Sequence, residues 1–256
     1  MNLLVDIGNA RIKWAVQDSS GWKTGPPLVR QQRAFKDLAR PAWKDLETPD
    51  RVIVASVAGE DYRKSVHTWV KRRWKIMPEF LRPEANQCGV SNAYSVPERL
   101  GSDRWANLLA VHAHYDGPAV VIDCGTAITI DAIDAEGTHL GGLIVPGMDL
   151  MSTALAEAAP GVQLQEQDNQ EVSLLGRNTE AAVSGGVLYA AVSLIDRVSL
   201  EDRGGVAHRG HRHRGQVGED AHRIRGTRVG PVVHHQLSGV GAGNVDVERR
   251  IRDGRV

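Results

Sequence analysis

The sequence predicts an α/β protein built from two similar lobes around a central cleft. The first observation is an internal repeat, because Asp6–Ala10 (DIGNA) recurs 117 residues later as Asp123–Ala127 (DCGTA). The second observation is that an apolar run precedes each copy and an alternating run follows it, as in a β-hairpin. A spaced repeat of a whole strand–turn–strand unit indicates two lobes of the same construction, each presenting a hairpin to a shared cleft.

The segments of the first lobe follow from their hydrophobic periods. Alternating or apolar runs predict strands, and apolar residues spaced three and four apart predict helices. Pro41 interrupts one helical pattern, because a proline inside a helix removes a hydrogen bond. The expected strands are Asn2–Val5, Arg11–Val16, Gly21–Gln31 and Arg51–Val57, and the expected helices are Gln32–Leu46, Gly59–Lys75 and Glu98–Tyr115.

The second lobe shows the same kinds of pattern. Turn-forming residues at Asp134–Gly137 separate two of its strands. The polar segment Ala159–Val172 has the composition of a lid or flap over a site. The expected strands are Ala119–Ile122, Ala127–Ile133 and His139–Pro146, and the expected helices are Gly147–Ala158 and Thr179–Leu200.

Composition limits the class of protein. With 256 residues and a net charge of zero, the chain can bury a sizeable core and has no global field for nucleic acid or a membrane surface. Cys88 and Cys124 lack zinc-site spacing, so we expect free thiols in a reducing compartment. We find no run near the roughly 20 apolar residues of a membrane span and no targeting segment, which predicts a cytoplasmic protein.

The composition changes abruptly after residue 200. Residues 201–256 hold 11 arginines, 11 glycines and 6 of the 10 histidines, without a period that could bury a core. Such residues arise when G/C-rich codons are read out of frame, so our hypothesis is a frameshift near residue 200. We therefore expect an N-terminal lobe at 1–116, an incomplete C-terminal lobe at 117–200 and an anomalous, disordered or frameshifted tail at 201–256.

The tips of both hairpins carry groups that bind phosphate. Each tip has a carboxylate at a strand end, then a glycine and a polar residue. Backbone N–H groups in such a turn hold a phosphate, and a carboxylate such as Asp6 can orient Mg²⁺ on ATP. Lys13 shares a strand face with Arg11, so one of the two could reach a phosphate. An exposed lysine without such a role is an equal alternative.

A further candidate is Gly101–Arg104 (GSDR), at the start of a predicted helix. It places a carboxylate beside a guanidinium where helix N–H groups also favour an anion. Ser102 or Asp103 could instead serve only as the helix N-cap, and for Asp103 the two roles are compatible.

Five motifs occur in a fixed order along the chain. They are D-x-G-N at Asp6–Asn9, Tyr94 seven residues before G-S-D-R, I-D-x-G-T at Ile122–Thr126, GG-x-I-x-PG at Gly141–Gly147 and G-R-N-T at Gly176–Thr179. In this order and spacing the chain closely resembles the type III pantothenate kinases from residue 2 to about 200. That family has the acetate kinase, sugar kinase, Hsp70 and actin fold, in which two RNase H-like lobes enclose a cleft.

The resemblance implies ATP-dependent phosphorylation of pantothenate by a homodimer, with Mg²⁺ and a monovalent cation (K⁺ or NH₄⁺). Asp103 would accept the proton of the pantothenate hydroxyl, and Asp123 would bind the monovalent cation. The other implied contacts are Asp6, Gly8, Asn9, Lys13, Gly125 and Thr126 for ATP, and Tyr94, Gly101, Ser102, Asp103, Arg104 and Thr179 for pantothenate.

The chain departs from the family pattern in two places. Ala10 stands where the family usually has a small hydroxyl residue, so one phosphate contact is lost. No T-G-G-type turn follows residue 200, which leaves the adenosine side of the site incomplete. Two other functions stay open: a phosphoanhydride phosphatase of the same fold, which would not need Tyr94 and GSDR, and an inactive regulatory or binding homologue.

Overall fold

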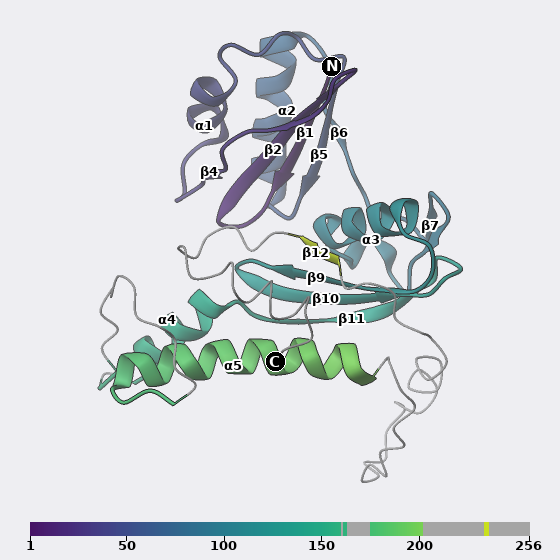
Figure 1. Cartoon of the computed structure of the whole chain (residues 1–256). Coiled ribbons are helices and arrows are strands. Elements are labelled where there is room, and N and C mark those ends of the chain that lie inside the picture. The colour runs from purple at the N-terminus through teal and green to yellow at the C-terminus, as the bar shows by residue number, and fades with distance from the viewer. Residues whose placement is uncertain (160, 163–174, 202–232, 236–256) are drawn as a thin grey trace. The chain divides into compact units, whose positions relative to one another are not determined.

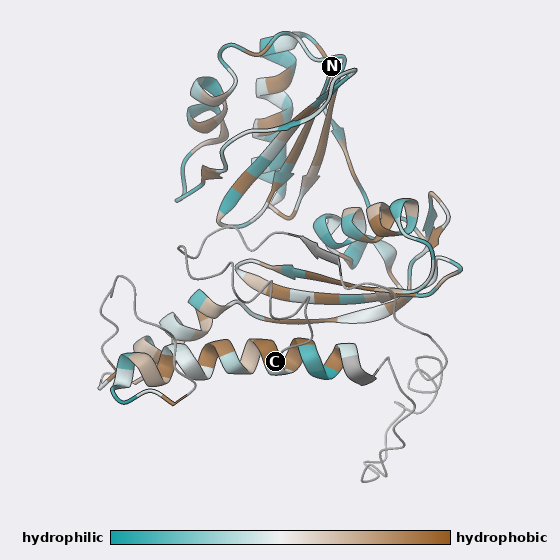
Figure 2. Ribbon diagram, viewed as in Figure 1, coloured by the Kyte–Doolittle hydropathy of each residue, from teal (hydrophilic) through white to brown (hydrophobic). Residues whose placement is uncertain are grey.

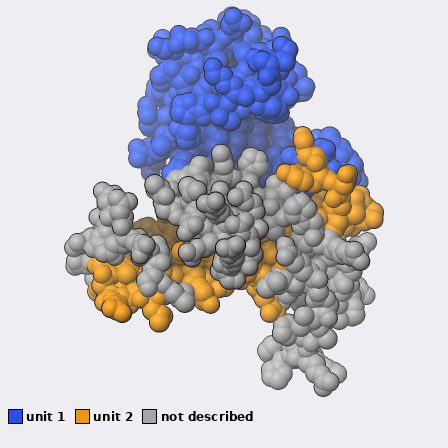
Figure 3. Space-filling model, in the orientation of Figure 1, with its two compact units in different colours: residues 1–113 blue, residues 114–256 orange. Residues whose placement is uncertain are grey.

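The computed structural model describes residues 1–159, 161–162, 175–201 and 233–235 (Figure 1). The chain divides into two compact units, Met1–Ala113 and His114–Val256 (Figure 3). This division falls close to the lobe boundary predicted after residue 116. Most of the expected lid at 159–172 and most of the tail lie outside the described residues.

The first unit is built on a mixed sheet with the strand order β3-β2-β1-β5-β6. Its first three strands run antiparallel, and β5 and β6 run parallel to β1. A short strand, β4, pairs with the start of β2. The strands are β1 (Asn2–Ile7), β2 (Arg11–Asp18), β3 (Gly21–Thr24), β4 (Leu28–Val29), β5 (Arg51–Ser56) and β6 (Glu79–Phe80).

Two helices, α1 (Phe35–Ala42) and α2 (Glu60–Trp74), pack on this sheet. Alternate residues of β1 are buried, and the alternation of apolar and polar positions along the strands is visible in Figure 2. Between the helices and the sheet lies a cluster of edge-to-face aromatic rings, among them Trp69 and Trp74 with centroids 5.2 Å apart. Such contacts add to the stabilisation that burial itself provides.

The second unit repeats the arrangement on a smaller scale, with the strand order β11-β10-β9-β12. Three antiparallel strands are again followed by one that runs parallel to the first of them. Helix α5 packs Ala191 and Ile195 against the sheet. The elements are β9 (Ala119–Cys124), β10 (Ala127–Ile133), β11 (His139–Pro146), α4 (Met148–Ala158), α5 (Thr179–Glu201) and β12 (Val233–His235). The predicted α/β fold with two like lobes is confirmed.

The two hairpins differ in the length of their turns. Ile7 pairs with Ile12 in the first hairpin, whereas Cys124 pairs with Ile128 in the second. The second turn is therefore one residue shorter, and the 117-residue offset of the Asp-x-Gly segments does not extend into the strands that follow. The predicted residue-by-residue match ends at the two turns.

Three expectations need correction. The strand expected over Gly21–Gln31 is two strands, β3 and β4, because Pro26 and Pro27 between them lack the N–H groups of a ladder. Strand β12 lies within the tail, where no strand was expected. Helix α5 is long and apolar enough to span a membrane by length and composition, and 11% of this stretch is buried in the structure, but one such helix does not by itself indicate a membrane span.

Candidate active site

The first turn, Gly8–Ala10, joins β1 to β2. The Gly8 N–H donates to the Arg11 carbonyl oxygen at 3.0 Å, and the side chains of Asn9 and Ala10 are exposed beyond it. Asp6 lies two residues before the turn and is paired with Lys13 across the hairpin. The half-buried carboxylate and the exposed ammonium group thus come from neighbouring strands next to an open backbone turn, an arrangement suited to a phosphate and its cation.

A chain of hydrogen bonds connects this turn to the start of helix α3 (Ser102–His114). The Val57 N–H, just after β5, donates to the Ile7 carbonyl oxygen at 3.1 Å. The neighbouring Ser56 N–H donates to the Ser102 hydroxyl oxygen at 2.8 Å. The carboxyl ends of β1 and β5 and the first turn of α3 therefore meet at one edge of the sheet, where α/β proteins commonly bind ligands.

Asp103 lies in the first turn of α3, which begins at Ser102. The Arg104 N–H donates to Asp103 Oδ1 at 2.7 Å. A Cβ atom added to Gly101 would lie 2.5 Å from that same oxygen, so the carboxylate occupies the space that a side chain would fill. The glycine of the GSDR motif is therefore required by the position of the Asp103 carboxylate. The helix N-terminus favours that negative charge.

Arg104 and Tyr94 come together within the first unit, as expected for parts of one site. Arg104 Nη1 donates to the Tyr94 hydroxyl oxygen at 2.9 Å, and only 4% of Arg104 is exposed. The Tyr94 N–H donates to Asn92 Oδ1 at 2.9 Å, which fixes the loop before α3. A guanidinium held in this way presents a planar cation suited to a carboxylate or phosphate.

The second turn, Gly125–Thr126, is held by the start of α4. The Gly147 N–H donates to the Thr126 carbonyl oxygen at 2.9 Å. A Cβ atom on Gly147 would overlap the carbonyl oxygens of Gly125 and Thr126. The close approach of two backbones thus explains why the last residue of the GG-x-I-x-PG motif is a glycine. The side chain of Thr126 is exposed.

Asp123 lies two residues before this turn, and Cys124 lies between them. Burial raises the pKa of the Cys124 thiol, and the adjacent Asp123 carboxylate raises that pKa further. The thiol is therefore protonated at neutral pH and does not act as a nucleophile there. Within the described residues, no three His, Cys, Asp or Glu side chains gather into a metal-binding group.

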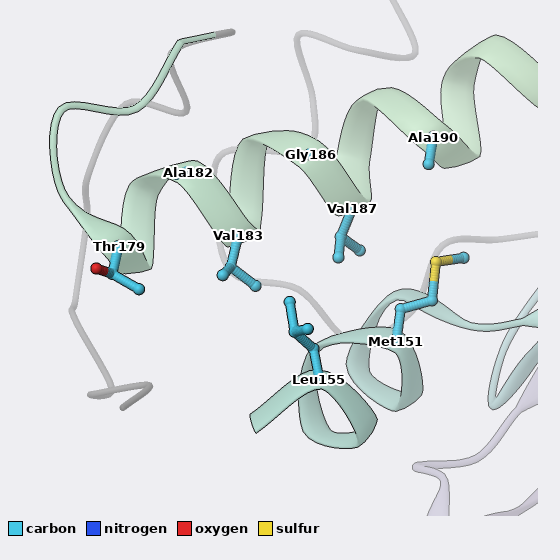
Figure 4. A pocket seen from close by; sticks show the side chains of 8 residues that line it. All are labelled: Met151, Leu155, Thr179, Ala182, Val183, Gly186, Val187 and Ala190. Carbon is cyan, nitrogen blue, oxygen red and sulfur yellow. The ribbon is translucent and has the colours of Figure 1, made fainter. Parts of the chain in front are cut away.

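Thr179 is the first residue of α5, whose start is capped by Asn178. The Ala181 N–H donates to Asn178 Oδ1 at 2.7 Å, which is the contact of a helix N-cap. Thr179 lines one end of an apolar groove between α4 and α5, together with Leu155 and Val183 (Figure 4). The G-R-N-T motif thus starts the helix, and Thr179 lies in the second unit.

The predicted site residues fall into two sets. Asp6, Gly8, Asn9, Lys13, Tyr94 and Gly101–Arg104 belong to the first unit, whereas Asp123, Gly125, Thr126 and Thr179 belong to the second. Hydrogen bonds tie the turn of the first set to its helix start. That the second set faces the first across a cleft stays a prediction.

A sequence model of the type III pantothenate kinases matches residues 2–201. This chain belongs to the type III pantothenate kinase family. Its relatives include the type III pantothenate kinase of Nitrosococcus oceani, which is 44% identical over 78% of this chain and 76% of its own length. That of Paracidovorax citrulli is 37% identical over 77% of this chain and 78% of its own. A solved structure from Campylobacter jejuni, described as a Baf family transcriptional activator, is 26% identical, with a TM-score of 0.47 over 76% of this chain and 78% of that one.

The match to the pantothenate kinase family ends where the composition of the chain changes. The family match stops at residue 201, and the match to the Nitrosococcus oceani kinase covers 76% of that kinase's length. This agrees with a frameshift near residue 200, which remains a hypothesis.

Sequence reasoning missed two parts of this kinase's site. Ser56 ends β5, Val57 follows it, and the two connect the first turn to α3, but nothing in a short buried strand marks these backbone contacts in advance. Arg30 also contacts the first turn, from a position 22 residues away from Gly8 along the chain. The sequence feature that could have indicated Arg30 is its position directly after a short run of strand-forming residues.

Proposed function

We propose that this chain transfers the γ-phosphoryl group of ATP to pantothenate. The product would be 4′-phosphopantothenate, and the reaction is the first step toward coenzyme A. Membership of the type III pantothenate kinase family supports this proposal. The structural observation that carries it is the pair of hydrogen bonds from Ser56 and Val57, which bring the phosphate-binding turn and Asp103 to one edge of the first sheet.

Within the proposed site, the two turns would hold the phosphates of ATP. Gly8, Asn9 and Lys13 contribute from the first unit, and Gly125 and Thr126 contribute from the second. Asn9, Gly125 and Thr126 are exposed at the turns, where backbone N–H groups suit phosphate oxygens. The carboxylates of Asp6 and Asp123 at strand ends are the oxygen ligands that hard cations prefer. We assign Asp6 to Mg²⁺ and Asp123 to a monovalent cation, K⁺ or NH₄⁺. Bound cations neutralise the charge that phosphoryl transfer spreads over the oxygens.

Pantothenate would lie beside the start of α3. Arg104 and Tyr94 supply a cation and a phenol that are already hydrogen-bonded to each other, and Gly101 leaves room for the Asp103 carboxylate. Asp103 would accept the proton of the primary hydroxyl as that oxygen attacks the γ-phosphorus. The Ser102 hydroxyl accepts from Ser56, so it supports the helix start in addition to any contact with substrate. Thr179 would close the pantothenate site from the second unit.

The cellular setting is part of the same proposal. We expect a cytoplasmic homodimer that binds pantothenate and ATP and acts on neither nucleic acid nor membranes. The zero net charge and the two free cysteines, Cys88 and Cys124, fit this setting.

The test is release of ADP from ATP that depends on pantothenate. Asp103→Asn should lower kcat by about 10²- to 10⁴-fold, the usual contribution of a positioned base. Its affinity for pantothenate should stay within about tenfold, because the amide keeps the size and polarity of the side chain. The matched control is Asp61→Asn, since Asp61 lies in the first turn of α2 as Asp103 does in α3, but is exposed.

The other outcomes are distinct. Unchanged turnover by Asp103→Asn would exclude Asp103 as the base. Release of phosphate without pantothenate would indicate a phosphatase. Stabilisation by pantothenate in a thermal-shift assay, without turnover, would indicate an inactive binding homologue.

A further inference from the structure

Arg30 contacts the first turn through both its backbone and its side chain. The Arg30 N–H donates to the Ala10 carbonyl oxygen at 2.9 Å, which continues the pairing of β4 with β2. The Arg30 guanidinium donates from Nη1 to the Gly8 carbonyl oxygen. A single residue therefore holds the carbonyl groups on both sides of Asn9.

These contacts fix the direction of an N–H group that would bind phosphate. In a planar trans peptide, the carbonyl of one residue and the N–H of the next point in opposite directions. With the Gly8 carbonyl turned toward Arg30, the Asn9 N–H points away from it. An arginine that holds this carbonyl thus orients the peptide between Gly8 and Asn9 before any nucleotide binds, and preorganised donors cost no rearrangement when charge arrives.

Arg30 is itself held from two sides. Its guanidinium carbon lies 4.1 Å from the centre of the Tyr62 ring, within cation–π range. The turn that follows it closes with a hydrogen bond of 2.6 Å from the Arg33 N–H to the Arg30 carbonyl oxygen. That turn puts Gln31 and Gln32 at φ values of 34° and 60°, a conformation unfavourable for residues other than glycine. Strain of this kind gathers at functional sites, where the surrounding structure enforces it.

We infer that Arg30 is a positioning residue for the phosphates of ATP, which acts by orienting the Gly8–Ala10 turn. This inference rests on the proposed function for the identity of the nucleotide. It also bears on Ala10, which replaces the hydroxyl residue usual in the family. In this chain the turn is held instead by Arg30, which follows β4. The role belongs to nucleotide binding and not to pantothenate binding, since the Arg30 guanidinium donates to the first turn, whereas Arg104 is the arginine that donates to Tyr94.

The test measures the KM for ATP and the KM for pantothenate separately in three variants: Arg30→Met, Arg30→Lys and Arg33→Met. Arg30→Met should raise the KM for ATP about tenfold or more, as expected for losing a charged hydrogen bond, and leave the KM for pantothenate within about twofold. Arg30→Lys keeps a charged donor without the planar fork and should recover part of the loss. Arg33→Met is the matched control, because Arg33 is exposed and its guanidinium donates to the Asp37 carbonyl oxygen, away from the first turn. Both constants should stay within about twofold in this variant.

Two results would overturn the inference: a KM for ATP within twofold of the parent in Arg30→Met, or equal rises in both constants. If Arg30→Met does not fold, Arg30→Lys decides by the same criteria. Calorimetric binding of MgATP without pantothenate separates this inference from the proposed function. Arg30-dependent MgATP binding without phosphorylation of pantothenate would leave the inference standing and remove the function. Phosphorylation of pantothenate that is unaffected by the Arg30 substitutions would support the proposed function and refute the inference. A chain that binds no MgATP would refute both.

Discussion

At the scale of residues, the contact between Gly101 and Asp103 carries the sharpest consequence. The Asp103 carboxylate occupies the place of a Gly101 side chain. We expect Gly101→Ala to push this carboxylate aside and lower kcat about 10- to 100-fold, because a misplaced catalytic group loses about that much. The melting temperature should change little, since the added methyl group meets the end of a side chain and not backbone. Steady-state kinetics and thermal unfolding of the same samples measure both.

Gly59→Ala is the control for that substitution. Gly59 precedes α2 as Gly101 precedes α3, but a Cβ atom there meets no described atom within 4 Å. Normal kcat in Gly59→Ala and reduced kcat in Gly101→Ala is the expected pair of results. Equal kcat values in the two variants would show that the Asp103 carboxylate does not need its present place.

The sequence predicts single site residues where their chemistry and position coincide. Asp6 at a strand end and Asp103 at a helix start are predicted because carboxylates at such places meet backbone N–H groups, and their roles stay predictions. Arg30 was not found, because its role depends on β4 pairing with β2, a contact between segments that neither period nor composition reveals. The partner of Ser102, a backbone N–H at the end of β5, is hidden for the same reason.

At the scale of elements, strands β10 and β11 share a buried polar pair. His139 Nε2 lies 2.9 Å from Asp131 Oδ1, and both side chains are almost fully buried. Asp131→Ala should lower the free energy of unfolding by about 3–5 kcal/mol, because it leaves a buried imidazole without its carboxylate. Asp131→Asn, which keeps an oxygen acceptor, should lose less.

Urea denaturation followed by circular dichroism measures both losses. Asp116→Ala is a control on an exposed loop of the same unit and should stay within about 0.5 kcal/mol. A loss below 1 kcal/mol in Asp131→Ala would mean that the pair is not important for stability.

Elements were predicted best where the hydrophobic period was long. Strands β10 and β11 match their predicted bounds, and α5 begins where expected. The hairpin of β7 (Asn86–Gln87) and β8 (Val90–Ser91) was missed. Its turn places Cys88 and Gly89 at φ values of 50° and 84°. Cysteine is not among the residues typical of such a turn, so the sequence pattern does not predict it.

At the scale of the whole molecule, the two units share one strand arrangement but differ in extent. The first sheet has six strands and the second has four in the described residues. The family match ends at residue 201, and about a quarter of the Nitrosococcus oceani kinase is not matched by this chain. The internal repeat predicted the shared arrangement. It could not predict β12, since the composition of the tail carries no strand period.

A chimera tests the importance of that missing region. It joins residues 1–201 of this chain to the portion of the Nitrosococcus oceani kinase that follows the position aligned with residue 201. We expect kcat/KM for ATP to rise about tenfold or more, because the resemblance places the adenosine side of the site in that portion. The KM for pantothenate should not change. The comparison is made by steady-state assay of both proteins at equal concentration, and equal efficiency would show that the present tail is sufficient.

Because the two hairpin turns differ in length, the loop of one unit cannot simply replace the loop of the other. Side chains alternate between the faces of a strand, so removing one residue from a hairpin loop reverses the face of every residue beyond it. Grafting the shorter Gly125–Thr126 loop onto β1 and β2 would aim Ile12 at solvent and Lys13 at the core, unless the strands re-paired. If the two units arose by duplication, one hairpin loop has since gained or lost a residue. The two loops are therefore no longer interchangeable.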